Sequence, residues 1–141
     1  MTSASRELLA PRTDVWALVA EPYNLPDWWR AYTGVVPDRR GLAPGARWKV
    51  VRRRKPGLLA KAGSEGLIVV TRVVEGTELG FQDVGEGTEA TLELASQGPD
   101  LTLATISVSA PWWRLYVEGV RNLPRDSLGN LYDLCQTAAA L

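Results

Sequence analysis

The apolar residues of this chain change their spacing along the sequence, and that change limits the folds that the chain can adopt. Between Tyr32 and Ser109 the spacing tends toward two, and clusters of glycine and proline cut the stretch into pieces of strand length. After Pro111 the apolar residues recur every three or four positions, as they do along one face of a helix. The sequence therefore predicts an antiparallel β-meander followed by a long helix.

Turn-forming residues set the bounds of the predicted elements. Two short helices are expected before the meander, over Asp14–Ala20 and Leu25–Ala31. Pro124 lies inside the predicted last helix, so we expect a kink or break there. The predicted strands are Ser5–Ala10, Val35–Arg40, Arg47–Arg54, Glu65–Val74, Glu78–Val84, Thr88–Ala95 and Leu101–Ser109.

Length and composition narrow the class of protein. A chain of 141 residues fits one domain, over positions 1–141, with enough buried surface for a real core. Cys135 is the only cysteine, so no disulfide can form within the chain. The sequence has no histidine, the usual general base and metal ligand, and we expect neither a metal nor a cofactor. Without a signal-like start or an apolar run of about 20 residues, we expect a cytoplasmic protein with no membrane span.

Charge is unevenly distributed along the chain although the net charge is zero. Positions 39–64 hold nine lysines or arginines and no acid, whereas positions 65–100 hold eight acids and a single cation, Arg72. The centre of the basic stretch, Arg52–Lys55, is either a solvated strand end or a surface for an acidic carrier protein, a phosphate or a membrane. The neutral total and the lack of a known motif argue against nucleic acid as a partner.

Paired tryptophans are the strongest pointer to function. Trp28 and Trp29 end the second predicted helix, and Trp112 and Trp113 begin the last one. Indole combines a large apolar surface with one N–H donor, which suits the wall of a pocket for a mostly apolar molecule with a few polar groups. The paired indoles therefore indicate a lined cavity.

The order of one strand, two short helices, six strands and a long helix resembles the helix-grip fold of the START-like (SRPBCC) superfamily. The resemblance implies an α+β domain in which a seven-stranded curved antiparallel sheet and the last helix enclose a cavity. It also implies a gate loop around Leu58, although this apolar loop could instead cover a sheet edge or a dimer partner, so we expect a monomer or a homodimer. The local carriers of the resemblance are Ala10–Trp16, Pro22, Leu25–Pro26, Trp28–Trp29, Pro44–Trp48 and the apolar stripe of Leu128, Leu131 and Leu134.

Alternation along the strands assigns residues to the predicted cavity. Arg52 shares a strand face with Trp48 and Val50, and Asp83 shares one with Leu79 and Phe81. Arg52 and Asp83 could form a structural pair, or Arg52 could bind an enolate or carboxylate while Asp83 moves a proton. Tyr116 is an alternative donor to a substrate carbonyl. The predicted ligand-binding residues are Trp28, Trp29, Tyr32, Trp48, Val50, Leu58, Phe81, Trp112, Trp113, Val120 and Leu123.

Two hypotheses for function follow. The first is a cofactor-independent cyclase or dehydratase for an apolar, carbonyl-bearing intermediate, because the pattern is similar to the polyketide cyclase/dehydrase-type branch of the superfamily. The second is a non-catalytic binder of an aromatic or lipid-like compound, a carrier, sensor or self-resistance protein, and the missing histidine favours it. A module that only docks on an acidic carrier protein through Arg52–Lys55 fits less well, because the aromatic residues converge inside the predicted fold. The resemblance alone favours the enzyme.

Overall fold

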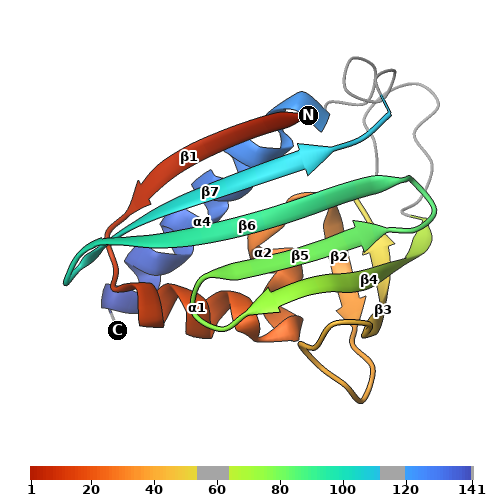
Figure 1. The fold of residues 1–141 in the computed structure, drawn as a ribbon, viewed down its shortest axis with the longest axis horizontal. Coiled ribbons are helices and arrows are strands. Elements are labelled where there is room, and N and C mark those ends of the chain that lie inside the picture. The colour runs from red at the N-terminus through yellow and green to blue at the C-terminus, as the bar shows by residue number, and fades with distance from the viewer. Residues whose placement is uncertain (54–63, 112–119, 141) are drawn as a thin grey trace.

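A computed structural model describes residues 1–53, 64–111 and 120–140, and Figure 1 shows how the elements are arranged. The strands are β1 (Thr2–Leu8), β2 (Tyr32–Val36), β3 (Arg47–Arg52), β4 (Glu65–Val74), β5 (Glu78–Asp83), β6 (Thr88–Gly98) and β7 (Leu101–Ser109). The helical elements are α1 (Arg12–Ala20), the 3-10 turn η1 (Pro22–Asn24), α2 (Leu25–Trp28), the 3-10 turn η2 (Val120–Asn122) and α4 (Leu123–Ala140).

The seven strands form one antiparallel sheet in the order β1-β7-β6-β5-β4-β3-β2. Strands β2 to β7 therefore form a meander, and β1 returns to pair with β7, with Thr2 opposite Val108. The predicted α+β class with seven antiparallel strands and a long C-terminal helix is confirmed. The order leaves β1 and β2 as the two edges of the sheet.

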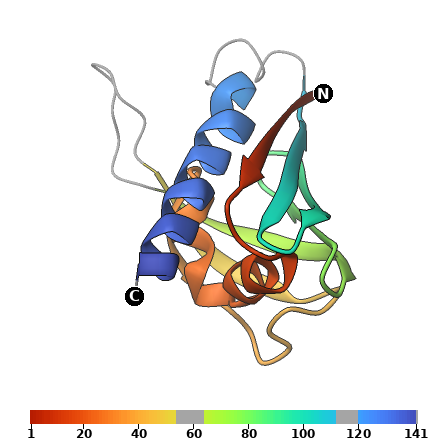
Figure 2. The ribbon, with the colours of Figure 1, turned by 90° about the vertical axis from the view of Figure 1, so that its left-hand side faces the viewer.

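The helices lie on one side of the sheet. Helix α4 crosses the inner face of the curved sheet, and α1 and α2 lie at one end of the same layer (Figure 2). The alternate residues of the strands that face this layer form the core together with the three helices. The largest fully buried side chains are Trp28, Trp29, Trp48, Leu8, Ile68, Leu79, Leu92, Ile106, Leu128, Leu131, Val15 and Val50.

Polar contacts join the helical layer to the strands. The Ser127 hydroxyl on α4 accepts a hydrogen bond of 3.1 Å from the backbone N–H of Arg30, just after α2. The guanidinium carbon of Arg6 on β1 lies 4.1 Å from the centre of the Tyr132 ring on α4, a cation–π contact. The position of α4 is therefore fixed at both α2 and the edge strand.

The first strand and helix begin earlier in the sequence than predicted. β1 covers Thr2–Leu8 rather than Ser5–Ala10, because its polar residues pair through the backbone and through a contact of 2.8 Å between the hydroxyls of Ser5 and Thr105. The hydrophobic pattern could not mark this strand. Helix α1 begins at Arg12, directly after Pro11, whose extended backbone ends the preceding segment.

The second helix is shorter than predicted and the second strand begins earlier. Helix α2 ends at Trp28, because Trp29 adopts an extended conformation with φ −89° and ψ 112° and leads the chain toward β2. Strand β2 starts at Tyr32 and ends at Val36, next to Pro37, which has no N–H to donate to a ladder. Asn24 donates its side-chain amide to the carbonyl of Leu18, 2.9 Å away.

The other strands differ from the prediction only at their ends. β4 and β7 have the predicted bounds, β3 and β5 stop slightly earlier, and β6 continues to Gly98 through a register shift near Ser96. The predicted break near Asn122 to Pro124 lies where the 3-10 turn η2 ends and α4 begins. This helix begins at Leu123, so Pro124 lies in its first turn, where the missing N–H has no helical partner to lose.

Candidate functional site

Arg52 and Asp83 meet on the inner face of the sheet, at the ends of β3 and β5. One terminal nitrogen of Arg52, Nη2, lies 2.6 Å from Asp83 Oδ1, and Nε lies 3.1 Å from Asp83 Oδ2. Only 3% of the surface of Asp83 is exposed. The predicted alternation accounts for this placement, because Val50 on β3 and Phe81 on β5 are buried on the same face.

A glycine on the intervening strand makes this contact possible. Strand β4 separates β3 from β5, so the Arg52 side chain must pass over β4 to reach Asp83. A Cβ atom at Gly66 would lie 2.5 Å from Arg52 Nη2, and one at Gly85 would lie 2.9 Å from the same nitrogen. The guanidinium therefore occupies a slot between two glycines, which we call the glycine slot (Gly66 and Gly85). Sequence reasoning did not identify either glycine.

The carboxylate of Asp83 accepts four hydrogen bonds. Oδ2 accepts one from Tyr32 OH at 2.9 Å and one from Arg52 Nε, and Oδ1 accepts one from Arg52 Nη2 and one from the backbone N–H of Glu86 at 3.2 Å. Two bonds on each oxygen use the acceptor capacity of an ionised carboxylate. In this arrangement Asp83 has no acceptor site left for a substrate proton.

The surroundings of Asp83 and Tyr32 hold each side chain in one protonation state. Burial alone would raise the pKa of Asp83, but the hydrogen bonds from Arg52 and Tyr32 outweigh burial and hold that pKa below its ordinary value. Burial, reinforced by the neighbouring Asp83 charge, raises the pKa of the Tyr32 hydroxyl. Asp83 is therefore ionised and Tyr32 neutral across the physiological range.

Arg52 is bound on its other side as well. Its Nη1 donates to the carbonyl of Glu65 at 3.0 Å and to the Ser64 hydroxyl at 3.4 Å, and Glu86 Oε1 lies 3.4 Å from Nε. These contacts connect β3, β4, β5 and the turn after β5. Ser64 and Glu86 were not predicted, because both lie in turns where alternation carries no information.

An aromatic cluster extends inward from α2. Trp29 packs edge-on against Phe81 with ring centres 5.2 Å apart, and Trp28 packs against Trp29 at 6.0 Å. The indole N–H of Trp28 is buried and has no hydrogen-bond partner among the described residues. By contrast, the indole N–H of Trp48 donates to the carbonyl of Gly41 at 2.9 Å. The sequence pointed to Trp28 but gave no sign that its donor is free.

The structure brings most of the predicted ligand-binding residues to the inner side of the sheet. Val120 is buried there and Leu123 packs against the core. The predicted residues Leu58, Trp112, Trp113 and Tyr116, and the basic residues Arg54 and Lys55, lie outside the described residues. The side chains buried in the core include Trp28, Trp29, Tyr32, Trp48, Val50 and Phe81.

Cys135 and the acidic residues give no sign of a second reactive centre. Burial raises the pKa of the Cys135 thiol, and the charge of Asp14 raises it further, so the thiol is unreactive where it packs. Within residues 1–53, 64–111 and 120–140, no cluster of three acidic, cysteine or histidine side chains could hold a metal ion. No helix in the described part of the chain is long and apolar enough to cross a membrane.

Comparisons with known proteins bear on the fold. No protein-family profile matches the sequence, and no curated protein matches it. An uncharacterised protein of Bacillus thuringiensis superposes with a TM-score of 0.73 at 14% identity, over 96% of this chain and 98% of that one. A protein of Nitrosomonas europaea superposes with a TM-score of 0.71 at 18% identity, over 99% of this chain and 96% of that one.

A third similar structure comes from a biosynthetic locus. DynU16, from the dynemicin biosynthetic locus, superposes with a TM-score of 0.68 at 20% identity, over 97% of this chain and 47% of that one. This chain thus spans about half the length of DynU16. At such identities the likeness concerns the fold, and the seven-stranded sheet with its C-terminal helix is compatible with the helix-grip class.

Proposed function

We propose that this protein binds a mostly apolar small molecule that carries an oxygen acceptor, between the inner face of the sheet and α4. The free indole N–H of Trp28 is the observation that carries this proposal. A buried donor without a partner costs about 1–3 kcal/mol, so such groups are rare in folded proteins unless a ligand or water completes them. A carbonyl, ether or hydroxyl oxygen of a ligand would complete this one.

The surroundings of Trp28 suit such a ligand. Trp28, Trp29 and Phe81 form an apolar aromatic cluster on the inner side of the sheet. Aromatic walls with a few polar groups are typical of small-molecule sites. The cluster of Arg52, Asp83 and Tyr32 lies on the same inner side and would meet a polar end of the ligand.

Catalysis as a cyclase or dehydratase is the second candidate, and the likeness to DynU16, a protein of a biosynthetic locus, favours it. In that case the site would fold a carbonyl-bearing intermediate so that reacting carbons meet. Arg52 would stabilise an enolate, and Tyr116 would donate to a carbonyl. Proton transfer by Asp83 would first require the loss of one of its four hydrogen bonds. An acidic carrier protein could deliver the intermediate.

A matched ligand pair tests the binding proposal. Fluorenone and fluorene differ by one carbonyl oxygen, and equilibrium dialysis measures the binding of each to the wild type. We expect fluorenone to bind at least about fivefold more tightly, since a single net hydrogen bond contributes about 1 kcal/mol. Trp28→Phe should remove this preference, whereas Trp16→Phe on α1, a control with the same change of side chain, should keep it.

The same experiment distinguishes the candidates. Equal binding of both compounds by the wild type would overturn the role of Trp28, and binding of neither would count against the site. Chromatography after incubation with linear polyketide mimics separates the enzyme from the binder. A new product formed by the wild type would support catalysis, and recovery of unchanged ligand would support binding alone.

A further inference from the structure

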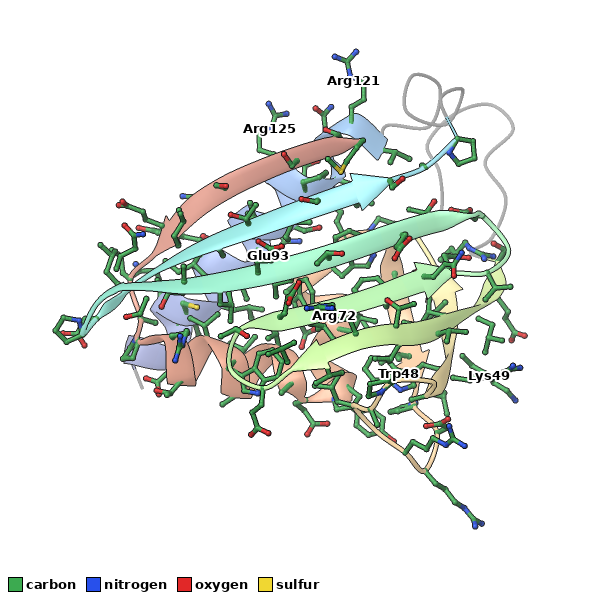
Figure 3. All side chains as sticks on the ribbon, viewed as in Figure 1. Trp48, Lys49, Arg72, Glu93, Arg121 and Arg125 are labelled. Carbon is green, nitrogen blue, oxygen red and sulfur yellow. The ribbon has the colours of Figure 1, made fainter. Side chains whose placement is uncertain are left out.

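The outer face of the sheet has no helix over it in the described part of the chain. The helices all lie on the opposite side, and the strands of the meander are open to solvent in Figure 3. Alternate residues of each strand point to this face, because the other half point into the core. These outward residues are charged differently on β2 and β3 than on β5 and β6.

The half of the outer face formed by β2 and β3 is basic and aliphatic. Arg47 and Lys49 point outward from β3, and neither makes an ion pair with another described residue. Around them lie Val36, Val51 and Val84, which are 61%, 37% and 55% exposed. We call this set of five residues the basic patch. Val36 lies directly opposite Lys49 in the strand register, so charge and apolar surface are adjacent.

The half formed by β5 and β6 is acidic and hollowed. Glu78 and Glu93 lie directly opposite each other in the register, an arrangement of like charges that is unfavourable in isolation. Arg72 compensates Glu78 through a contact of 2.8 Å, and Glu93 forms no ion pair with a described residue. A shallow depression of about 460 Å³ lies here, which we call the acidic groove, lined by Thr77, Glu78, Glu93, Leu94, Ala95, Leu103 and Thr105.

The basic patch and the acidic groove cannot satisfy each other within one molecule. Strands β4 and β5 lie between β3 and β6, so Lys49 and Glu93 are separated by at least about 14 Å at the usual strand spacing. Both surfaces nevertheless belong to the same face of the sheet. A second copy of the chain can therefore present each surface to its complement.

We propose that two copies of this protein form a symmetric dimer through the outer faces of their sheets, with the basic patch of each copy on the acidic groove of the other. A two-fold axis in the plane of contact that bisects the line from Lys49 to Glu93 places each residue over its counterpart in the second copy. Such an interface is self-complementary and closed, as two-fold interfaces are. The aliphatic stem of Lys49 packs against Leu103 and Ala95 while its ammonium reaches Glu93.

Charge reversal tests this dimer. The molar mass of wild-type protein, measured by light scattering during size-exclusion chromatography at low ionic strength, should be that of a dimer. Lys49→Glu brings three glutamates together at each contact, the new one with Glu78 and Glu93 of the other copy, and Glu93→Lys pairs lysine with lysine. Each change should raise the dissociation constant by at least about tenfold, because like charges meet twice per dimer. Arg125→Glu on α4, an exposed cation away from the outer face (Figure 3), should leave it unchanged.

Mixing the two variants provides the decisive observation. An equimolar mixture of Lys49→Glu and Glu93→Lys chains pairs opposite charges at both contacts, so it should form a heterodimer with the wild-type mass. The double variant Lys49→Glu/Glu93→Lys should likewise dimerise alone.

Two results would overturn the dimer. One is a wild-type protein that is monomeric at about 100 µM, a concentration at which even weak interfaces associate, and the other is a mixture of the two variants that stays monomeric. Wild-type monomer that sediments with anionic phosphatidylserine vesicles would also overturn it and assign the basic patch to a membrane.

Discussion

The carboxylate of Asp83 and the indole N–H of Trp28 are both buried polar groups on the inner side of the molecule, but their surroundings differ completely. Within the described part of the chain, Asp83 has four hydrogen-bond donors around it, whereas the indole N–H of Trp28 has no acceptor. A satisfied buried group stabilises the fold and gains nothing from a ligand, whereas an unsatisfied one gains a hydrogen bond when a ligand arrives. The comparison therefore supports a mainly structural role for the Asp83 cluster and the recognition role that we propose for Trp28.

Removing a hydrogen-bond donor from the cluster of Arg52, Asp83 and Tyr32 should have the largest effect on stability. Arg52→Gln removes the cation from the buried Asp83 carboxylate, so we expect the free energy of unfolding at pH 7 to fall by about 3–5 kcal/mol. Urea unfolding followed by circular dichroism measures this change. Arg47→Gln, an exposed arginine on the same strand, should change stability by less than about 0.5 kcal/mol. Equal losses in the two variants would show that the Asp83 pair stabilises nothing.

The loss caused by Arg52→Gln should depend on pH. Because the pKa of Asp83 is lowered in the folded wild type, its stabilisation is present above the ordinary aspartate pKa of about 4 and is lost as pH falls through the folded value. In the variant, burial without the cation favours the protonated acid. The gap in stability between wild type and variant should therefore narrow as the pH is lowered from 7 toward 3. A gap that stays constant over this range would contradict an ionised pair.

Filling the glycine slot should have an intermediate effect. In Gly66→Ala the new methyl group meets the Arg52 guanidinium, which can move only by lengthening its bonds to Asp83. We expect a loss of about 1–3 kcal/mol in thermal unfolding, typical of overpacking. Gly98→Ala is the control, because a Cβ at Gly98 meets no atom within 4 Å. If the two variants melt alike, Arg52 is free to rearrange.

Two threonines with buried hydroxyl groups repeat the comparison on a smaller scale. The Thr102 hydroxyl donates to the carbonyl of Ala10 at 2.8 Å, whereas the Thr88 hydroxyl oxygen is buried and has no partner among the residues that the structure describes. Thr102→Val should lower the free energy of unfolding by about 1–2 kcal/mol, and Thr88→Val should leave it unchanged or raise it by a few tenths. Chemical denaturation of both variants measures the difference. A larger loss for Thr88→Val would mean that its hydroxyl is satisfied in solution.

The fold could be predicted largely because its strands carry their own pattern. β7 alternates, β4 is rich in β-branched residues, and both are bounded by turn residues, so both were located correctly. The start of β1 was predicted too late, because its inward residues include Thr2 and Arg6 and its pairing depends on β7, far away in the sequence. Local patterns contain no information on such distant pairing.

The candidate site could be predicted only in part, for a similar reason. Alternation placed Arg52 and Asp83 on the inner face, because each lies on a regular strand. The glycine slot and the contact from Glu86 arise from register and turn geometry. The free donor of Trp28 depends on every neighbour of its ring, so no property of the sequence near Trp28 could reveal it. The catalytic roles of Arg52, Asp83 and Tyr116 stay predictions.

The pairing of β1 with β7 has a consequence for how the chain folds while it is being synthesised. Ser5 and Thr105 lie side by side although 100 residues separate them, so β1 leaves the ribosome well before the strand with which it pairs. During that interval β1 is an unpaired edge, and its polar sequence, with Leu8 as its only large apolar residue, offers little to a neighbouring nascent chain. The addition of β1 to the sheet depends on contacts between residues that are distant in the sequence. Such contacts make folding slower than contacts between neighbouring residues do. The polar character that hid this strand from the hydrophobic pattern thus keeps it soluble until the rest of the sheet has been synthesised.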